Sequence, residues 1–227
     1  YIFLIYNPET KEAVICDPGV DGPVLKIISE KKLNLKYIIN THHHWDHIDG
    51  NESIKSNTGC EVIGYKNDAE RIKAIDITVD DGQVIDILGS QVKVMHVPGH
   101  TMGHIVYYFI NEKWLFVGDT IFAMGCGRLF EGSYQDMFYS LKKLKSLPAE
   151  TKIFCAHEYT LTNCEFALSV DSNNKDLQNR YKDVKNKRQN GVPTIPTNMK
   201  IELKTNPFLR ADSLDEFKEL RAKRDNW

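Results

Sequence analysis

Short apolar runs of the kind that form strands recur through the first 156 residues. Each run holds a few residues rich in β-branched and aromatic side chains, and polar or glycine-containing segments separate the runs. Runs this short, bounded by turn residues, are typical of β-strands. We therefore predict eight strands, at residues 1–6, 13–16, 37–40, 61–64, 91–97, 105–110, 115–117 and 152–156.

Helical patterns occupy other parts of the chain. Residues 24–32 predict one helix, and a second is predicted to begin at Ser133. Ser133 and Asp136 have the spacing of a capping box, in which each residue satisfies a backbone amide of the other. The apolar face that follows recurs at helical spacing and consists of Met137, Leu141 and Leu144.

The strand pattern stops after His157. Residues 160–190 are polar and helical in character, a proline-containing link follows at 191–196, and a last helix is predicted at 213–224. The chain is therefore expected to be α+β and to divide unequally. We predict a larger domain and a smaller helical domain, at residues 1–159 and 160–227.

Composition agrees with a globular chain and adds one asymmetry. The 227 residues include 41% apolar and 26% charged side chains, with a formal net charge of −2. Residues 175–227 hold 13 Lys and Arg against 8 Asp and Glu, whereas residues 1–174 hold 16 against 23. A basic tail can serve nucleic acid, a membrane surface or a small anionic ligand, and composition does not choose among them.

The cysteines indicate a reducing compartment. There are five, an odd number, and no two stand in a Cys-x-x-Cys pair. This argues against both a disulfide framework and a zinc site made of cysteines alone. No apolar run approaches the ~20 residues that span a bilayer. We expect a cytoplasmic protein, or an organellar one if a targeting segment precedes Tyr1, where the chain starts inside an apolar run.

Four of the eight histidines lie within the segment Thr-His-His-His-Trp-Asp-His at residues 41–47. In an extended segment alternate side chains share a face, so His42 and His44 can converge on one cation while His43 points away. Asp46 and His47 follow, where they could serve a second cation. Imidazole and carboxylate ligands suit zinc, manganese or iron, and the lack of thiolate disfavours a purely structural zinc site.

Further ligands are expected from three later segments. His100 lies in Pro-Gly-His-Thr-Met-Gly-His, Asp119 in Phe-Val-Gly-Asp-Thr, and His157 in Phe-Cys-Ala-His-Glu-Tyr. Side chains just past strand ends are held by a rigid scaffold and remain open to substrate. The other histidines are interpreted as packing or as support for ligands, namely His43, His96 and His104.

These motifs together resemble the metallo-β-lactamase superfamily and, within it, the glyoxalase II (hydroxyacylglutathione hydrolase) family. The His-x-His-x-Asp-His motif is typical of the superfamily alone. The narrower resemblance rests on Gly-Cys-Gly-Arg-Leu-Phe-Glu-Gly at 125–132, His-Glu-Tyr at 157–159, Asn-Pro-Phe at 206–208 and Leu-Arg-Ala-Lys-Arg-Asp at 220–225. It implies an αββα sandwich followed by a small helical substrate-binding domain.

The resemblance also implies a binuclear centre and a reaction. It places a first metal on His42, His44 and His100, a second on Asp46, His47 and His157, and Asp119 between them as a bridge. Two divalent ions are implied, zinc first, with iron or manganese as alternatives. The nucleophile is a metal-bridging hydroxide held at Asp46 and Asp119. The implied reaction converts S-D-lactoylglutathione, or another 2-hydroxyacylglutathione, to the hydroxy acid and glutathione in methylglyoxal detoxification.

Substrate contacts are implied in the same way at Arg128, Tyr159, Arg221 and Arg224. Arginines suit the two carboxylates of glutathione, because each offers a planar fork of donors. Phe130 stands where other members have tyrosine, so one hydroxyl hydrogen bond is lost. Cys126 has no base paired with it and is not expected to act as a nucleophile, and Cys155 is expected in the core. The expected partner is a small molecule, for a monomer that binds neither nucleic acid nor membrane.

The same motifs disfavour three other functions. A glutathione persulfide dioxygenase on the same fold would need one iron and no helical tail, and the complete second ligand set disfavours it. A nuclease or other phosphodiesterase would need a nucleic-acid surface, whereas the basic excess here is modest and terminal. A metal-binding regulator would be expected to lack a ligand, and none is missing.

Overall fold

The computed structural model describes residues 1–227 and divides them into two compact units. The first unit contains Tyr1–His96 and Gly103–Glu112, and the second contains Val97–Met102 and Lys113–Trp227. The predicted border between residues 159 and 160 lies inside the second unit, at the start of a helix. That border stays a prediction. No helix is long and apolar enough to span a lipid bilayer.

A five-stranded sheet forms much of the first unit. Its order is β1-β2-β3-β4-β5, with β1 antiparallel to β2 and the other pairs parallel. Parallel neighbours end at the same edge of a sheet, so the segments after β2 and β3 lie there together. The strands are Phe3–Tyr6, Glu12–Cys16, Asn34–Ile39, Glu61–Tyr65 and Ile77–Val79.

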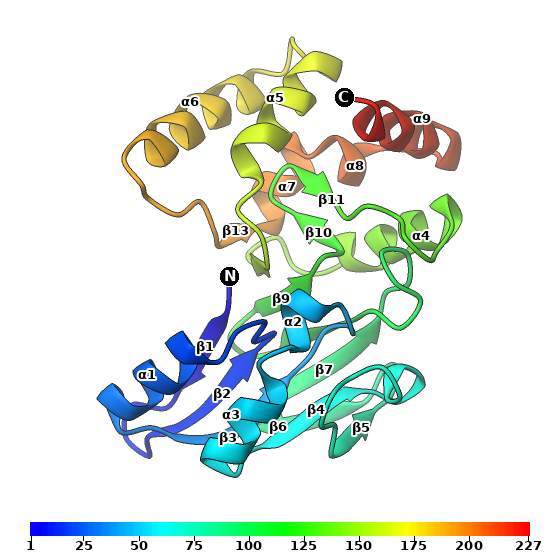
Figure 1. Ribbon diagram of the computed structural model, residues 1–227. Coiled ribbons are helices and arrows are strands. Elements are labelled where there is room, and N and C mark those ends of the chain that lie inside the picture. Colours follow the sequence, from blue (N-terminus) through cyan, green and yellow to red (C-terminus); the bar gives the residue numbers. More distant parts are fainter. The chain divides into compact units, whose positions relative to one another are not determined.

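Two helices cover one face of this sheet, as Figure 1 shows. They are α1 (Gly22–Lys31) and α3 (Asn51–Thr58). The strands bury β-branched side chains against them, and the common core includes Val24, Ile28, Ile38, Ile54 and Val62. Each Å² of apolar surface removed from water stabilises the fold by about 25 cal/mol, so this core is the main stabilising contribution to the first unit.

The remaining strands of the first unit form an antiparallel ladder. Strands β6 (Val84–Ile87), β7 (Ser90–His96) and β8 (Ile105–Phe109) pair in sequence order. All five residues of β8 are buried, which explains its continuous apolar sequence without polar alternation. The short helices α2 (Trp45–Ile48) and η1 (Lys66–Asp68) complete the unit.

The second unit combines three paired strands, a hairpin and six helices. Strand β9 (Trp114–Gly118) is parallel to β12 (Lys152–Cys155), which is antiparallel to β13 (Thr197–Asn198). The hairpin consists of β10 (Ile121–Phe122) and β11 (Gly125–Cys126). The helices are α4 (Tyr134–Lys145), α5 (Thr160–Val170), α6 (Lys175–Gln189), α7 (Met199–Thr205), α8 (Pro207–Arg210) and α9 (Leu214–Asp225).

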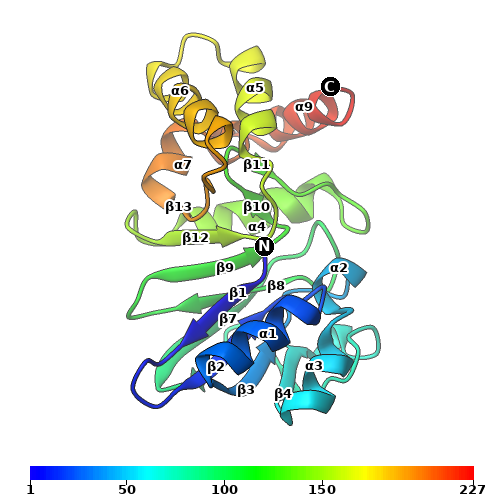
Figure 2. The same ribbon diagram turned by 60° about the vertical axis from the view of Figure 1, so that its left-hand side comes forward.

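The helices α5 and α6 lie side by side (Figures 1 and 2) and share a core. That core contains Met124, Cys164, Ala167, Leu177 and Val184. The polar character of residues 160–190 had predicted helix, and the structure confirms it with a break between the two helices at residues 171–174.

The eight predicted strands and the predicted helices are confirmed, with ends that differ by a few residues. The capping box is also confirmed: the Ser133 hydroxyl accepts from Asp136 N–H at 3.2 Å, and Asp136 accepts from Ser133 N–H at 2.8 Å. The prediction missed short elements whose sequences are mostly polar or only two to four residues long, including α2, β10, β11 and β13.

Candidate metal centre

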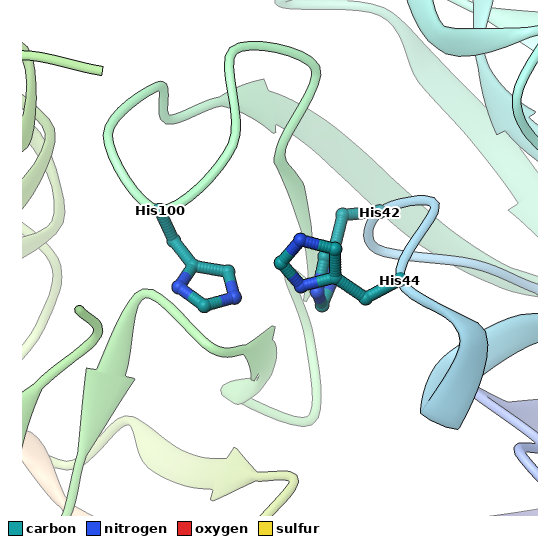
Figure 3. A group of neighbouring side chains, drawn as sticks. All are labelled: His42, His44 and His100. Carbon is teal, nitrogen blue, oxygen red and sulfur yellow. The ribbon is translucent and has the colours of Figure 1, made fainter. Parts of the chain in front are cut away.

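The first unit gathers four of the predicted ligands immediately after β3. The ring centroids of His42 and His44 lie 4.7 Å apart, and those of His42 and His47 lie 4.2 Å apart. His47 Nε2 is 3.7 Å from the Asp46 carboxylate. Figure 3 draws His42 and His44 on the loop after β3, together with His100 from the loop after β7. The imidazole and carboxylate groups of these four residues thus lie close together in the segment that follows β3.

A buried carboxylate at the end of β2 orients these rings. Asp17 accepts hydrogen bonds from the Thr41 amide at 2.8 Å and the Thr41 hydroxyl at 2.7 Å, and it lies 3.1 Å from His47 Nδ1. The Thr41 hydroxyl oxygen in turn lies 3.0 Å from His42 Nδ1. Because the Thr41 hydroxyl donates its hydrogen to Asp17, it accepts from His42 Nδ1, which assigns His42 the tautomer with its lone pair on Nε2. Asp17 also holds the His47 ring by its Nδ1 side.

His43 faces away from its neighbours, as the alternation predicts. His43 Nδ1 lies 3.1 Å from the fully buried Asp68 carboxylate, and Arg71 Nε donates to the other oxygen of Asp68 at 2.6 Å. His104, also buried, stacks on the His42 ring with centroids 4.6 Å apart. Both histidines therefore lie where they support the ligand loop.

The second unit brings together the other three predicted ligands. Asp119 follows β9 and His157 follows β12, so the parallel pairing of these strands places both at one sheet edge. One Asp119 oxygen lies 3.4 Å from His157 Nε2 and 3.5 Å from His100 Nε2. His100 Nδ1 contacts the Arg128 carbonyl at 2.7 Å, which assigns it the same tautomer with the lone pair on Nε2.

This donor set fits divalent metal ions. Imidazoles whose second nitrogen is fixed by a carboxylate, hydroxyl or carbonyl are the usual metal-ligating histidines of proteins. The nearby thiols are buried, and burial raises the pKa of Cys155 to about 12 and also raises the pKa of Cys126. Both thiols therefore stay protonated at neutral pH, in agreement with the prediction that Cys126 is no nucleophile and that Cys155 is a core residue.

Gly127 is needed for the ligands of the second unit to sit where they do. A Cβ atom on Gly127 would lie 1.9 Å from the Asp119 carbonyl oxygen and 3.3 Å from His100 Cβ. We expect Gly127→Ala to displace both ligands and to weaken metal binding about 10- to 100-fold, the range found when the support of a ligand is lost. Competition with a chromogenic chelator measures it. Gly22→Ala is the control, because a Cβ there meets nothing within 4 Å; equal affinity in the two variants would contradict the prediction.

A cavity in the second unit collects all four predicted substrate contacts. Its volume is about 250 Å³, and its lining is mostly polar. Arg128 and Tyr159 enter it from loops, and Arg221 and Arg224 enter it from α9. The full lining consists of Phe122, Cys126, Arg128, Tyr159, Asn163, Arg221, Arg224 and Asp225. We call it the arginine pocket.

The two arginines of α9 differ in how they are held. Arg221 is 5% exposed, donates to the Cys126 carbonyl at 3.0 Å and to Asp225 at 2.8 Å, and lies over the Phe208 ring. Arg224 is only partly buried and approaches Asn163 Oδ1 at 3.4 Å. Desolvation and the neighbouring Arg221 lower the pKa of Arg224. Arg221 thus also holds the pocket wall, whereas more of Arg224 is open to a ligand.

Aromatic rings complete the arrangement. Tyr159 stacks on His157 with centroids 5.0 Å apart and is 48% exposed. Phe130 is 61% exposed and lies against both the His100 ring and the Arg128 guanidinium. Both rings therefore lie on the surface, each beside a predicted metal ligand, and not in the core.

The sequence interpretation missed the residues that contact the predicted ligands and the predicted substrate-binding residues. Asp17, Thr41 and Asp68 were not singled out as functional, and Asn163, which contacts Arg224, was not predicted either. Only Asp17 had a local signal: it ends an apolar strand and precedes Pro-Gly. Its partners lie 24 and 30 residues away in the sequence, beyond any local pattern.

Comparison with known proteins identifies relatives over the whole length of the chain. Residues 1–157 match the model of the metallo-beta-lactamase superfamily, and residues 158–227 match that of the hydroxyacylglutathione hydrolase C-terminus. A protein of Pelagibacter ubique named hydroxyacylglutathione hydrolase is 45% identical over 227 residues, which cover 100% of this chain and 95% of that protein. One of Rhodospirillum rubrum with the same name is 47% identical, covering 95% and 84%.

Solved structures support the fold. The ETHE1 structure from Myxococcus xanthus matches with a TM-score of 0.75 at 25% identity, covering 99% of this chain and 86% of that one. The B3 metallo-beta-lactamase BLEG-1 matches with a TM-score of 0.71 at 23% identity, covering 92% and 94%. The predicted α+β metallo-β-lactamase fold with a C-terminal helical domain is confirmed.

Proposed function

We propose a two-metal thioester hydrolysis for this chain, which belongs to the hydroxyacylglutathione hydrolase family of the metallo-β-lactamase superfamily. The chain is a hydrolase whose substrates are 2-hydroxyacylglutathiones such as S-D-lactoylglutathione. The observation that carries this conclusion is the match along its full length, including the C-terminal domain that holds α9. The products are the hydroxy acid and glutathione.

We assign seven residues as ligands of two divalent ions. His42, His44 and His100 would hold the first ion, Asp46, His47 and His157 the second, and Asp119 would contact both. When bound, two such ions lower the pKa of a shared water and polarise the thioester carbonyl. Zinc is proposed first, with iron or manganese as alternatives, because these donors suit all three. Elemental analysis of the purified protein decides among them.

The chain's own residues orient the imidazole rings before substrate arrives. The Thr41 hydroxyl and the Arg128 carbonyl contact Nδ1 of His42 and of His100, so Nε2 of each ring is the nitrogen that would bind a cation. Asp17 lies 3.1 Å from Nδ1 of His47 and holds that ring from the same side. Since a thiol has a pKa of about 8.5, the departing glutathione needs little proton donation, and no general acid is assigned.

The arginine pocket is proposed to bind the glutathione part of the substrate. Arg128 and Arg224 would contact its carboxylates, and Tyr159 would contact its backbone. Arg221 would act mainly by holding the Cys126 segment and Asp225 in place, because its guanidinium already donates to both. Phe130 has no hydroxyl group to donate a hydrogen bond. Substrate affinity at this position would therefore depend on the Arg128 guanidinium and on the Phe130 ring.

Arg224→Ala is expected to raise KM about tenfold and to change kcat little. One charge-assisted hydrogen bond to a carboxylate contributes about 1.5 kcal/mol, and contacts far from the reacting carbonyl bind substrate and transition state equally. Steady-state kinetics with S-D-lactoylglutathione measures both constants. Lys223→Ala is the matched control, since Lys223 neighbours Arg224 on α9 but does not line the arginine pocket. A fall in kcat with unchanged KM would contradict this placement.

We also propose a compartment, an oligomeric state and a class of binding partner. All five cysteines are free and buried, which supports a reducing compartment such as the cytoplasm. We propose a monomer that binds the small thioester and neither nucleic acid nor membrane. The alternative activity, oxidation of glutathione persulfide, requires a single iron. It would not explain why a second set of metal-binding side chains is present, namely Asp46, His47 and His157.

A further inference from the structure

A second cavity lies in the second unit, apart from the arginine pocket. It has a volume of about 280 Å³ and is formed where α4 packs against α8. No residue is common to the linings of the two cavities. The lining consists of Phe138, Leu141, Lys142 and Lys145 from α4 and of Phe208, Leu209, Ala211 and Asp212 from α8 and the residues that follow it.

The floor of this cavity is apolar and its rim is charged. Leu141, Phe208 and Leu209 are each 2% exposed, so they form a rigid base. Phe138 and Phe208 both pack on the buried Phe217 ring, which fixes their positions. The rim bears two ammonium groups, on Lys142 and Lys145, and one carboxylate, on Asp212.

The two lysines have the geometry of an anion site over an apolar floor. They stand three residues apart on one helix and thus share a face. Neither forms an ion pair or a side-chain hydrogen bond within the chain, whereas many other charged residues of the protein, such as Lys113 and Lys187, do. An apolar floor with ammonium groups at one edge is complementary to a molecule that has an apolar body and one anionic end.

We propose that the α4–α8 cavity binds a small amphiphilic carboxylate, with a chain or ring of roughly eight carbons on the apolar floor and the carboxylate at Lys142 and Lys145. The size follows from the volume, which lies at the lower end of the range of small-molecule sites. Asp212, the one carboxylate among the lining residues, repels the anion and limits its affinity. The ligand is a free molecule in solution, and the site is separate from that of the thioester.

Isothermal titration of the full-length protein with octanoate tests this proposal. We expect saturable binding of one octanoate per chain with a Kd on the order of 0.1–1 mM, as befits about ten non-hydrogen atoms. Butyrate shares the carboxylate and lacks most of the apolar body, and 1-octanol shares the body and lacks the charge. Both are expected to bind at least several-fold more weakly than octanoate, because each offers only half of the complementarity.

Three variants locate the site. K142Q/K145Q is expected to weaken octanoate about tenfold and Asp212→Asn to tighten it about two- to fourfold, the range for exposed charge pairs. K182Q/K185Q has the same spacing on α6 and should leave the affinity unchanged. Since Lys142 and Lys145 are on the surface, loss of folding does not confuse the result, and thioester hydrolysis without octanoate should be unaffected.

Several outcomes would overturn the proposal. They are the absence of saturable octanoate binding, equal affinity in K142Q/K145Q and the unaltered protein, or binding of 1-octanol as tight as that of octanoate. Attachment to vesicles containing phosphatidylglycerol without any binding of octanoate would assign the lysines to a membrane surface and would also contradict it. None of these results bears on the hydrolase activity, so the two proposals fail independently.

Discussion

Replacing Asp119 by asparagine is expected to remove most of the bound metal and to lower kcat/KM about 10³-fold, equivalent to about 4 kcal/mol of transition-state stabilisation. The reason is its position: one carboxylate oxygen lies within 3.5 Å of both His100 Nε2 and His157 Nε2. An amide of the same shape keeps the fold and loses the negative charge that holds cations together. Metal content and hydrolysis are measured on the same preparation.

Asp215→Asn provides the control for this substitution. Asp215 is an exposed carboxylate on α9, and its side chain is 89% exposed, so the same chemical change there should alter neither metal content nor rate. Full metal content and a rate within a few-fold of the unaltered protein in Asp119→Asn would show that Asp119 is not a ligand. The bridging assignment would then be withdrawn.

Replacing Glu202 by alanine is expected to destabilise the protein by about 3–5 kcal/mol, the cost of breaking a buried ion pair by removal of one partner. Glu202 is fully buried on α7 and accepts from Arg180 at 2.5 Å, Thr197 at 2.6 Å and the Met124 amide at 2.9 Å. It also accepts from Asn206 Nδ2 at 3.0 Å. Removal leaves a largely buried guanidinium without its carboxylate partner and the Met124 amide without its acceptor.

Urea unfolding of the purified protein measures this effect, with Glu219→Gln, an exposed site on α9, as the control. Because Glu202 joins α6, the β10–β11 turn and α8, its loss should also lower the apparent affinity for the glutathione part of the substrate. A change in the free energy of unfolding below about 1 kcal/mol, as at an ordinary surface site, would contradict the account of this network.

Local pattern predicted the elements and the ligand candidates for a physical reason. Strand β9 buries an apolar run and β3 ends in the apolar residues Tyr37, Ile38 and Ile39, so the polar residue that follows each run stands out in the sequence. Asp119 and His157 could be found in this way because Asp119 directly follows β9 and His157 follows β12 after one residue. The capping box at Ser133 is likewise a local interaction, complete within four residues.

Tertiary contacts were out of reach of such patterns. Asp17 contacts Thr41 and His47, and these contacts form only because β2 and β3 are parallel neighbours in the sheet. Arg221 resembles a solvated residue of a charged helix, yet it is buried against Phe208 and Cys126. The basic residues of 175–227 therefore do not share one role, because Arg180 and Arg221 form buried contacts within the chain whereas Arg224 lines the arginine pocket and is only partly buried.

The most direct test of the account is the rate of thiol release from S-D-lactoylglutathione by metal-free protein titrated with zinc. The account predicts that the rate rises with added metal, reaches its plateau at two ions per chain, and is abolished by a chelator. No thiol release at any metal loading, together with oxygen uptake on glutathione persulfide by the iron-loaded protein, would contradict it.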